Sequence, residues 1–191
     1  MLEAIKQADR EGFLWLNGHH AEWLDVVMYW VSDRWIWIPF YLWLIYLIFR
    51  TYGRQGWVLL LGLVVATALA DRISSGFFKP YFERLRPCHD PLLADRVHLL
   101  QAHCGGTYGF ISSHAANTFA LATYLWLAWR KKIPASALLF AWATLVSYSR
   151  IYAGVHFPLD VLTGGLLGVG LAFLCFRSVA WIEERYRPIK T

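Results

Sequence analysis

The chain has 191 residues, of which 58% are hydrophobic, 17% aromatic and only 16% charged, with a mean hydropathy of +0.39. Soluble domains carry about 25% charged residues, and one of this size buries only about two-thirds of the surface that its unfolded chain exposes. The composition therefore excludes disordered chains, coiled coils and disulfide-rich scaffolds, and it indicates an integral membrane protein. The net charge of +5 suits anionic lipids or a phosphorylated substrate, and the lack of a dense basic run before the C-terminal residues argues against nucleic acid.

The first 33 residues predict elements at the membrane surface. Leu2, Ile5, Phe13 and Leu16 share one face of an amphipathic helix. The apolar segment at 23–31 is too short to cross a bilayer and is interrupted by acids. We expect an interfacial helix followed by a half-inserted one, and the alternative is a sixth span that has residues 20–33 as its outer part. No apolar segment of the signal-peptide type follows the N-terminal charges, so we expect no cleaved signal.

Five apolar stretches follow without the strict alternation of barrel strands, which predicts transmembrane helices. They lie at 35–49, 57–70 (continuing to about 78), 115–129, 133–148 and 157–176. The predicted fold is an all-α, polytopic helical bundle of five to six spans in a single membrane domain, 1–191. Its parts are interfacial helices in 1–33, two spans in 35–79, a long loop in 80–113 and three spans in 114–180. We favour a monomer, in which the glycines at 164, 165, 168 and 170 pack helices inside the bundle; the alternative is that they form a dimer face.

The connections differ in charge. The links at 50–56 and 130–132 and the tail from Arg177 hold nine Lys and Arg with two acids, and the opposite side also holds nine, with eleven acids. If Lys79, Arg86 and Arg150 serve catalysis, they are left out of the comparison. The side of the short links then has nine Lys and Arg, and the side of the long loop has six. The positive-inside rule then places the short links in the cytoplasm and the long loop outside.

The long loop carries two cysteines, Cys88 and Cys104. On the extracytoplasmic side we expect them to form a disulfide. The alternative is a Cys/His metal site with His89, His98 and His103, but its spacing matches no common zinc pattern, so we expect no metal.

Three polar clusters lie on the loop side under this topology. One ends the second span, one begins the third, and one crosses the turn between the last two: Lys79 and Arg86; Ser112, Ser113 and His114; Arg150, His156 and Asp160. Arginine and lysine neutralise phosphate, and a helix that begins at serine presents free N–H groups and a positive dipole end to an anion. Pro158 suits the first position of the last helix, which puts Asp160 in its first turn, within reach of one ring nitrogen of His156.

These clusters read K-x6-R-P, S-x-H and S-R-x5-H-x3-D, and over residues 79–160 they resemble the signature of the type 2 phosphatidic acid phosphatase superfamily. The resemblance is strongest to small bacterial membrane lipid phosphatases. It implies that His156 is a nucleophile forming a phosphohistidine, that Asp160 orients it, and that His114 is the acid and base. Four side chains and one backbone N–H would bind the phosphoryl oxygens without a metal or cofactor: Lys79, Arg86, Ser112, Arg150 and the N–H of Ser113.

The second cluster departs from the family's usual P-S-G-H, because Ile111 replaces the proline and Ser113 the glycine. A serine fits that glycine position only with a negative φ, as at the start of a helix.

We expect an integral membrane lipid phosphatase of the bacterial cytoplasmic membrane, with its active site on the extracytoplasmic side and a lipid phosphate or diphosphate as substrate. Undecaprenyl diphosphate is the first substrate expected, followed by phosphatidylglycerophosphate and phosphatidic acid. Alternatives are a lipid phosphotransferase, a lipid A phosphatase, or a catalytically silent binding or scaffold protein, against which the complete catalytic set argues. Asp71, an acid inside a span, is either functional or paired with a loop or helix end.

Overall fold

The computed structural model describes residues 1–100 and 104–185, and within them every regular element is a helix. The all-α class predicted from the sequence is therefore confirmed. Pro158 begins the last helix, as its fixed φ and missing N–H favour. The main helices are α1 (Leu2–Gly18), α2 (Glu22–Ser32), α3 (Ile38–Tyr52), α4 (Gly56–Arg72), α5 (Lys79–Phe82), α6 (Ser113–Trp129), α7 (Leu138–Tyr152) and α8 (Pro158–Arg185).

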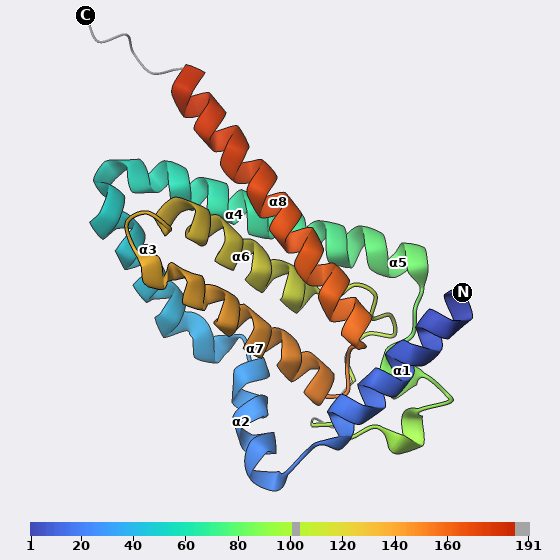
Figure 1. Cartoon of the computed structure of the whole chain (residues 1–191). Helices are drawn as coiled ribbons and strands as arrows, with labels where there is room; N and C mark the ends of the chain where they lie inside the picture. Colours follow the sequence, from blue (N-terminus) through green and yellow to red (C-terminus); the bar gives the residue numbers. More distant parts are fainter. Residues whose placement is uncertain (101–103, 186–191) are drawn as a thin grey trace, which may run out of the picture.

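An elongated bundle of α3, α4, α6, α7 and α8 makes up most of the molecule (Figure 1). Helix α6 lies at its centre, packed against α4, α7 and α8. Small residues on α6 allow this close packing, since Ala116 and Ala120 are fully buried. Large side chains fill the end of the core that lies away from the polar clusters, where Tyr124 and Trp129 are buried.

Helices α4 and α5 form one continuous column from Gly56 to Phe82, joined by a π-helical turn at Ile73–Phe78. At 1.5 Å per residue the column is about 40 Å long. It ends at Phe82, a few residues beyond the end of the predicted span, so Lys79 lies on the helix, where the sequence placed the end of that span.

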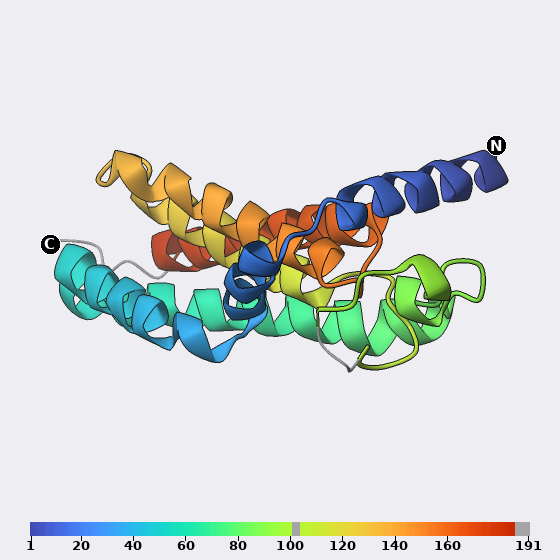
Figure 2. The same cartoon turned by 90° about the horizontal axis from the view of Figure 1, so that it is seen from below.

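Alternate connections lie at opposite ends of the bundle. The α3–α4 and α6–α7 links and the C-terminal end of α8 share one end, while α1, the long loop and the α7–α8 turn share the other (Figures 1 and 2). This arrangement brings the three polar clusters to the same end.

Two helical stretches of the described chain are long and apolar enough to cross a membrane, Trp35–Phe82 and Pro158–Ile182. The first includes the α3–α4 hairpin, which turns at Gly53 with a φ of +54°. Helices α6 and α7 have 17 and 15 residues, below the roughly 20 of a typical span. The count of five to six spans therefore stays a prediction.

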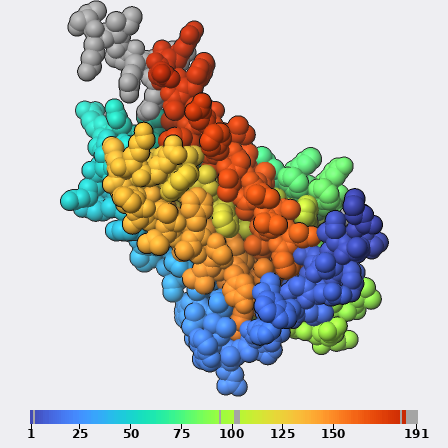
Figure 3. Space-filling view, in the orientation of Figure 1, coloured from blue at the N-terminus to red at the C-terminus, as the bar shows by residue number. Residues whose placement is uncertain are grey.

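Helix α1 lies across the loop-side end of the bundle and contacts the beginning of α8 (Figure 3). Its inner face buries Phe13 and Asn17. The Asn17 amide donates hydrogen bonds to the carbonyls of Tyr152 at 2.9 Å and His98 at 3.0 Å. Helix α1 is thereby attached to both the end of α7 and the long loop.

Candidate functional site

The predicted residues of all three clusters converge at the end of the bundle covered by α1. Lys79 begins α5, His114 lies in the first turn of α6, Arg150 in the last turn of α7, and His156 in the turn before α8. The charges of Lys79, Arg86 and Arg150 all act on the His156 imidazole, and those of the same three groups act on His114. Residues up to 81 positions apart in the sequence therefore form one polar site.

The starts of α6 and α8 are joined directly. The Ser112 N–H donates to the Asp160 carbonyl at 2.9 Å, and the Ser112 hydroxyl accepts from the Ala115 N–H at 3.5 Å, so Ser112 caps α6. Glycine at 164 permits this approach, because a Cβ there would lie 2.5 Å from the Ser112 carbonyl oxygen. The close contact brings the α6 N-terminus beside the Asp160 turn.

Ser113 is the first residue of α6 and has helical backbone geometry. The condition for a serine at the family's glycine position is therefore met. Its hydroxyl lies 3.1 Å from that of Ser75, which directs the side chain toward the π-helical turn. Ile111, at the usual proline position, is buried, with 1% of its surface exposed.

His156 and Asp160 form a buried pair, 2% and 0% exposed. The His156 Nδ1 lies 3.5 Å from the Asp160 Oδ2, beyond hydrogen-bond range but short enough to tighten when a substrate binds. Oδ2 also accepts from the Phe157 N–H at 2.9 Å. Burial, reinforced by the charges of Arg86, Arg150 and Lys79, lowers the pKa of His156 well below its usual value. The imidazole is therefore neutral at physiological pH, as a nucleophile must be.

The guanidinium groups of the buried Arg86 and the half-buried Arg150 line a cavity of about 270 Å³ together with Ser32, Gly105 and Val155. Arg86 donates to the Val155 carbonyl at 3.4 Å, and Arg150 donates to the Ser32 hydroxyl. The Nε of each arginine is buried, with no hydrogen-bond partner among the described residues. Buried donors of this kind require an acceptor, and a phosphoryl group supplies several.

Three contributors to this site escaped the sequence analysis: Asp9 on α1, Ser32 on α2 and Arg84 in the long loop. The Arg84 guanidinium contacts the carboxylates of Asp9 at 2.5 Å and Asp160 at 2.8 Å. The sequence held one signal for Asp9, which is four residues before the apolar Phe13 and thus on the same helical face.

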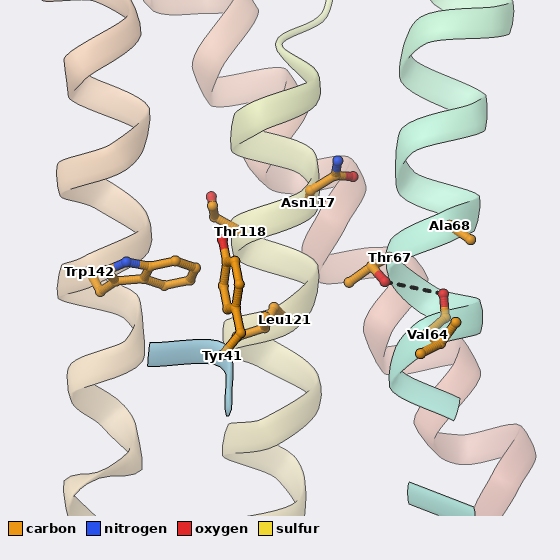
Figure 4. Close-up of a pocket in the computed structure, with 8 residues that line it drawn as sticks. All are labelled: Tyr41, Val64, Thr67, Ala68, Asn117, Thr118, Leu121 and Trp142. Carbon is orange, nitrogen blue, oxygen red and sulfur yellow. Dashed lines mark hydrogen bonds between the residues drawn. The ribbon is translucent and has the colours of Figure 1, made fainter. Parts of the chain in front are cut away.

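A groove of about 400 Å³ between α3, α4, α6 and α7 lies one turn along α6 from His114 (Figure 4). At its end nearest the site, the Asn117 amide donates to the Asp71 carboxylate at 3.1 Å. Asp71 is therefore paired with α6. The walls are mostly apolar and comprise Tyr41, Val64, Thr67, Ala68, Asn117, Thr118, Leu121 and Trp142.

Cys88 and Cys104 form a disulfide in the long loop, with their Cα atoms 6.2 Å apart. The ligand atoms of Cys88, His89 and Cys104 lie within 4.8 Å of one another, but disulfide sulfurs are not the thiolates that bind metals. His98, another member of the alternative metal site, pairs instead with Asp25 at 3.0 Å. His103 lies outside the described residues.

Comparison with known proteins finds a family match over most of the chain. Residues 55–184 match the PAP2 superfamily. A lipid A 4'-phosphatase of Porphyromonas gingivalis is 33% identical over 97% of the chain and 78% of its own length. A lipid A 4'-phosphatase of Bacteroides thetaiotaomicron is 35% identical over 88% of the chain and 75% of its own length. An undecaprenyl-diphosphatase of Sulfolobus acidocaldarius is 31% identical over 86% of the chain and 75% of its own length. The crystal structure of LpxE from Aquifex aeolicus superposes with a TM-score of 0.63 at 30% identity, over 87% of this chain and 93% of that one.

Proposed function

The chain belongs to the PAP2 superfamily, and we propose that it hydrolyses a phosphate ester of a lipid A-type glycolipid through a phosphohistidine. The observation that carries the proposal is the convergence of His156, His114 and three cations at one end of a membrane-type bundle. Lipid A now ranks ahead of undecaprenyl diphosphate, the first substrate expected from the sequence. Two lipid A 4'-phosphatases are similar to nearly the whole chain, at a slightly higher identity than the undecaprenyl-diphosphatase.

In the first step, the free ring nitrogen of His156 attacks phosphorus while Asp160 holds the other nitrogen. An N–P bond forms and the ester P–O bond breaks. His114, which enters the step protonated because the bound phosphate dianion offsets the surrounding cations, donates its proton to the departing sugar oxygen. Lys79, Arg86 and Arg150 stabilise the charge on the three equatorial oxygens. The hydroxyl of Ser112 and the N–H of Ser113 complete the phosphate-binding groups at the positive end of α6.

In the second step, His114 takes a proton from water, whose oxygen attacks phosphorus as the N–P bond breaks. Inorganic phosphate leaves and both imidazoles return to their starting states. The residues that we assign to this cycle supply the nucleophile, acid, base and positive charge, so no step calls for a metal ion.

We further propose that α3, α4, α6, α7 and α8 cross the cytoplasmic membrane, with the site facing the extracytoplasmic side. Exposed apolar side chains on the outer faces support lipid contact, among them Leu42, Leu61 and Leu174, each more than 60% exposed. The disulfide at the site end supports an oxidising compartment there. The basic α3–α4 and α6–α7 links lie at the other end, as the positive-inside rule favours for the cytoplasm.

The groove of Figure 4 is suited to an acyl chain of the substrate. Apolar walls favour the chain, and the Asn117 amide at the site end is placed to meet a polar group near the ester.

The experiment that tests this function is a substrate panel with purified protein in detergent, assayed for released phosphate. It compares lipid A, undecaprenyl diphosphate, phosphatidylglycerophosphate and phosphatidic acid, and mass spectrometry locates the phosphate removed. We expect the highest kcat/KM on lipid A. Faster turnover of undecaprenyl diphosphate would contradict the assignment of lipid A as the substrate. Transfer of a labelled phosphate to a second lipid without release of free phosphate would favour a phosphotransferase.

A further inference from the structure

Arg84 connects the N-terminal helix to the carboxylate that faces His156. Its Nη1 lies 2.8 Å from the Asp160 Oδ1, and its Nη2 lies 2.5 Å from the Asp9 Oδ2. The guanidinium carbon also stacks 4.2 Å from the centre of the Phe157 ring. Arg84 thus contacts α1, α8 and the residue next to the nucleophile, although it comes from the long loop.

Asp9 is buried, and both of its oxygens are used. While Oδ2 pairs with Arg84, Oδ1 accepts from the Leu159 N–H at 2.9 Å, in the first turn of α8. The Asp9 side chain is 1% exposed and burial raises its pKa, whereas Arg84 and the Leu159 N–H favour the ionised form. A carboxylate in such a place persists only where its charge is paired.

The inner face of α1 fixes this contact. Asp9, Phe13 and Asn17 follow at four-residue intervals and form one stripe toward the bundle. Phe13 packs edge-on against Phe157 with ring centres 5.4 Å apart, and Asn17 binds the end of α7. The stripe therefore contacts the chain on both sides of His156.

The two oxygens of Asp160 have separate partners. Oδ1 is held by Arg84, and Oδ2 accepts from the Phe157 N–H while facing the His156 Nδ1. Without Arg84 the carboxylate could rotate about its terminal bond and lose its alignment with the imidazole. Neither Arg84 nor Asp9 touches the cavity between Arg86 and Arg150.

We infer that Arg84 and Asp9 are positioning residues that hold Asp160 against His156, so that α1 is part of the catalytic apparatus as well as a surface helix. The inference rests on the proposed phosphatase function. Asp9 acts through Arg84, Arg84 acts through Asp160, and neither contacts the reacting atoms.

The test measures kcat and KM for phosphate release from diphosphoryl lipid A in detergent micelles. Asp9→Asn keeps an oxygen for the Leu159 N–H but removes the charge that holds Arg84, and Arg84→Gln removes the cation. Arg84→Lys keeps the charge but loses the two-pronged contact. Arg10→Gln is the matched control, because Arg10 is the next residue of α1 and pairs with Asp90 instead, at 3.0 Å.

We expect kcat to fall about 10- to 100-fold in Asp9→Asn and Arg84→Gln, with KM within about twofold of wild type. Arg84→Lys should retain more activity than Arg84→Gln, and Arg10→Gln should match the wild type. The double variant should be no slower than Arg84→Gln alone, because the two residues act in series. Thermal midpoints identify any variant that fails to fold. If Arg84→Gln fails to fold, the kcat values of Asp9→Asn and Arg84→Lys test the inference.

Unchanged kcat in Asp9→Asn and Arg84→Gln would overturn the inference, and so would a loss confined to KM or losses that multiply in the double variant. The wild-type rate tests the proposed function separately. A wild type that releases no phosphate from lipid A contradicts that substrate, and the variants are then compared on phosphatidic acid.

Discussion

Gly164→Ala tests whether the contact between α6 and α8 sets the catalytic geometry. The new Cβ would lie 2.5 Å from the Ser112 carbonyl oxygen, whereas ordinary contact begins at 3.4 Å, so the helices must separate by about 1 Å. That shift moves Ser112 and His114 away from Asp160 and His156. A displacement of about 1 Å in a catalytic group costs on the order of 100-fold in rate.

The matched control is Gly170→Ala, because a Cβ at that position of α8 meets nothing within 4 Å. We expect Gly164→Ala to lower kcat for phosphate release about 100-fold and to destabilise the fold by about 1–3 kcal/mol. The control should keep wild-type activity and gain about 0.5–1 kcal/mol from better helix propensity. Both are measured as phosphate release and thermal unfolding in detergent. Equal activity of the two variants would refute the reasoning.

Three other properties follow from the site. The pKa of His156 is lowered well below 6.5, so near pH 6.5 the unfolded chain binds a proton that the folded protein does not bind. This contribution to the free energy of unfolding is therefore complete above pH 6.5. It is lost as the pH falls, by up to about 1.4 kcal/mol per pH unit. Thermal melts of wild type and His156→Asn at pH 7.5 and 5.5 measure it, and an advantage of the wild type that does not shrink at pH 5.5 would contradict it. The Cys88→Ser/Cys104→Ser variant should lose about 3 kcal/mol of stability, because the disulfide closes a loop of 16 residues. It should also raise KM, because Gly105, next to Cys104, packs beside Arg86. An unchanged KM would show that the disulfide does not support phosphate binding. EDTA should leave phosphate release intact and vanadate should inhibit it, whereas activity lost to EDTA and restored by a divalent metal would count against the proposed steps.

The main helices follow directly from the sequence, because a long apolar run leaves little choice of secondary structure or position. Local chemistry also fixed two helix starts: Ser112 caps α6 and Pro158 begins α8, both as predicted. The motifs indicated that Lys79, His114 and His156 would meet, and the structure does bring them together at one end of the bundle.

Contacts between distant segments had no such local signal. Arg84 and Asp9 are 75 residues apart, and only the path of α1 across the bundle brings them together. The column α4–α5 ends at Phe82, a few residues past the predicted stretch, and its π-helical turn lies against α6, as the contact between Ser75 and Ser113 illustrates. Glycine at 164 indicated helix packing, but its contact with the Ser112 carbonyl depends on the register between α6 and α8, which periodicity does not specify.

The most direct measurement of the central claim is to trap the covalent intermediate. Purified protein is mixed with substrate labelled in its phosphate, quenched within milliseconds in alkali, which preserves phosphohistidine, and mapped by mass spectrometry. We expect the label on His156 and none in His156→Gln, which should also release no phosphate. Label on another residue, or phosphate release that persists in His156→Gln, would contradict the proposed mechanism.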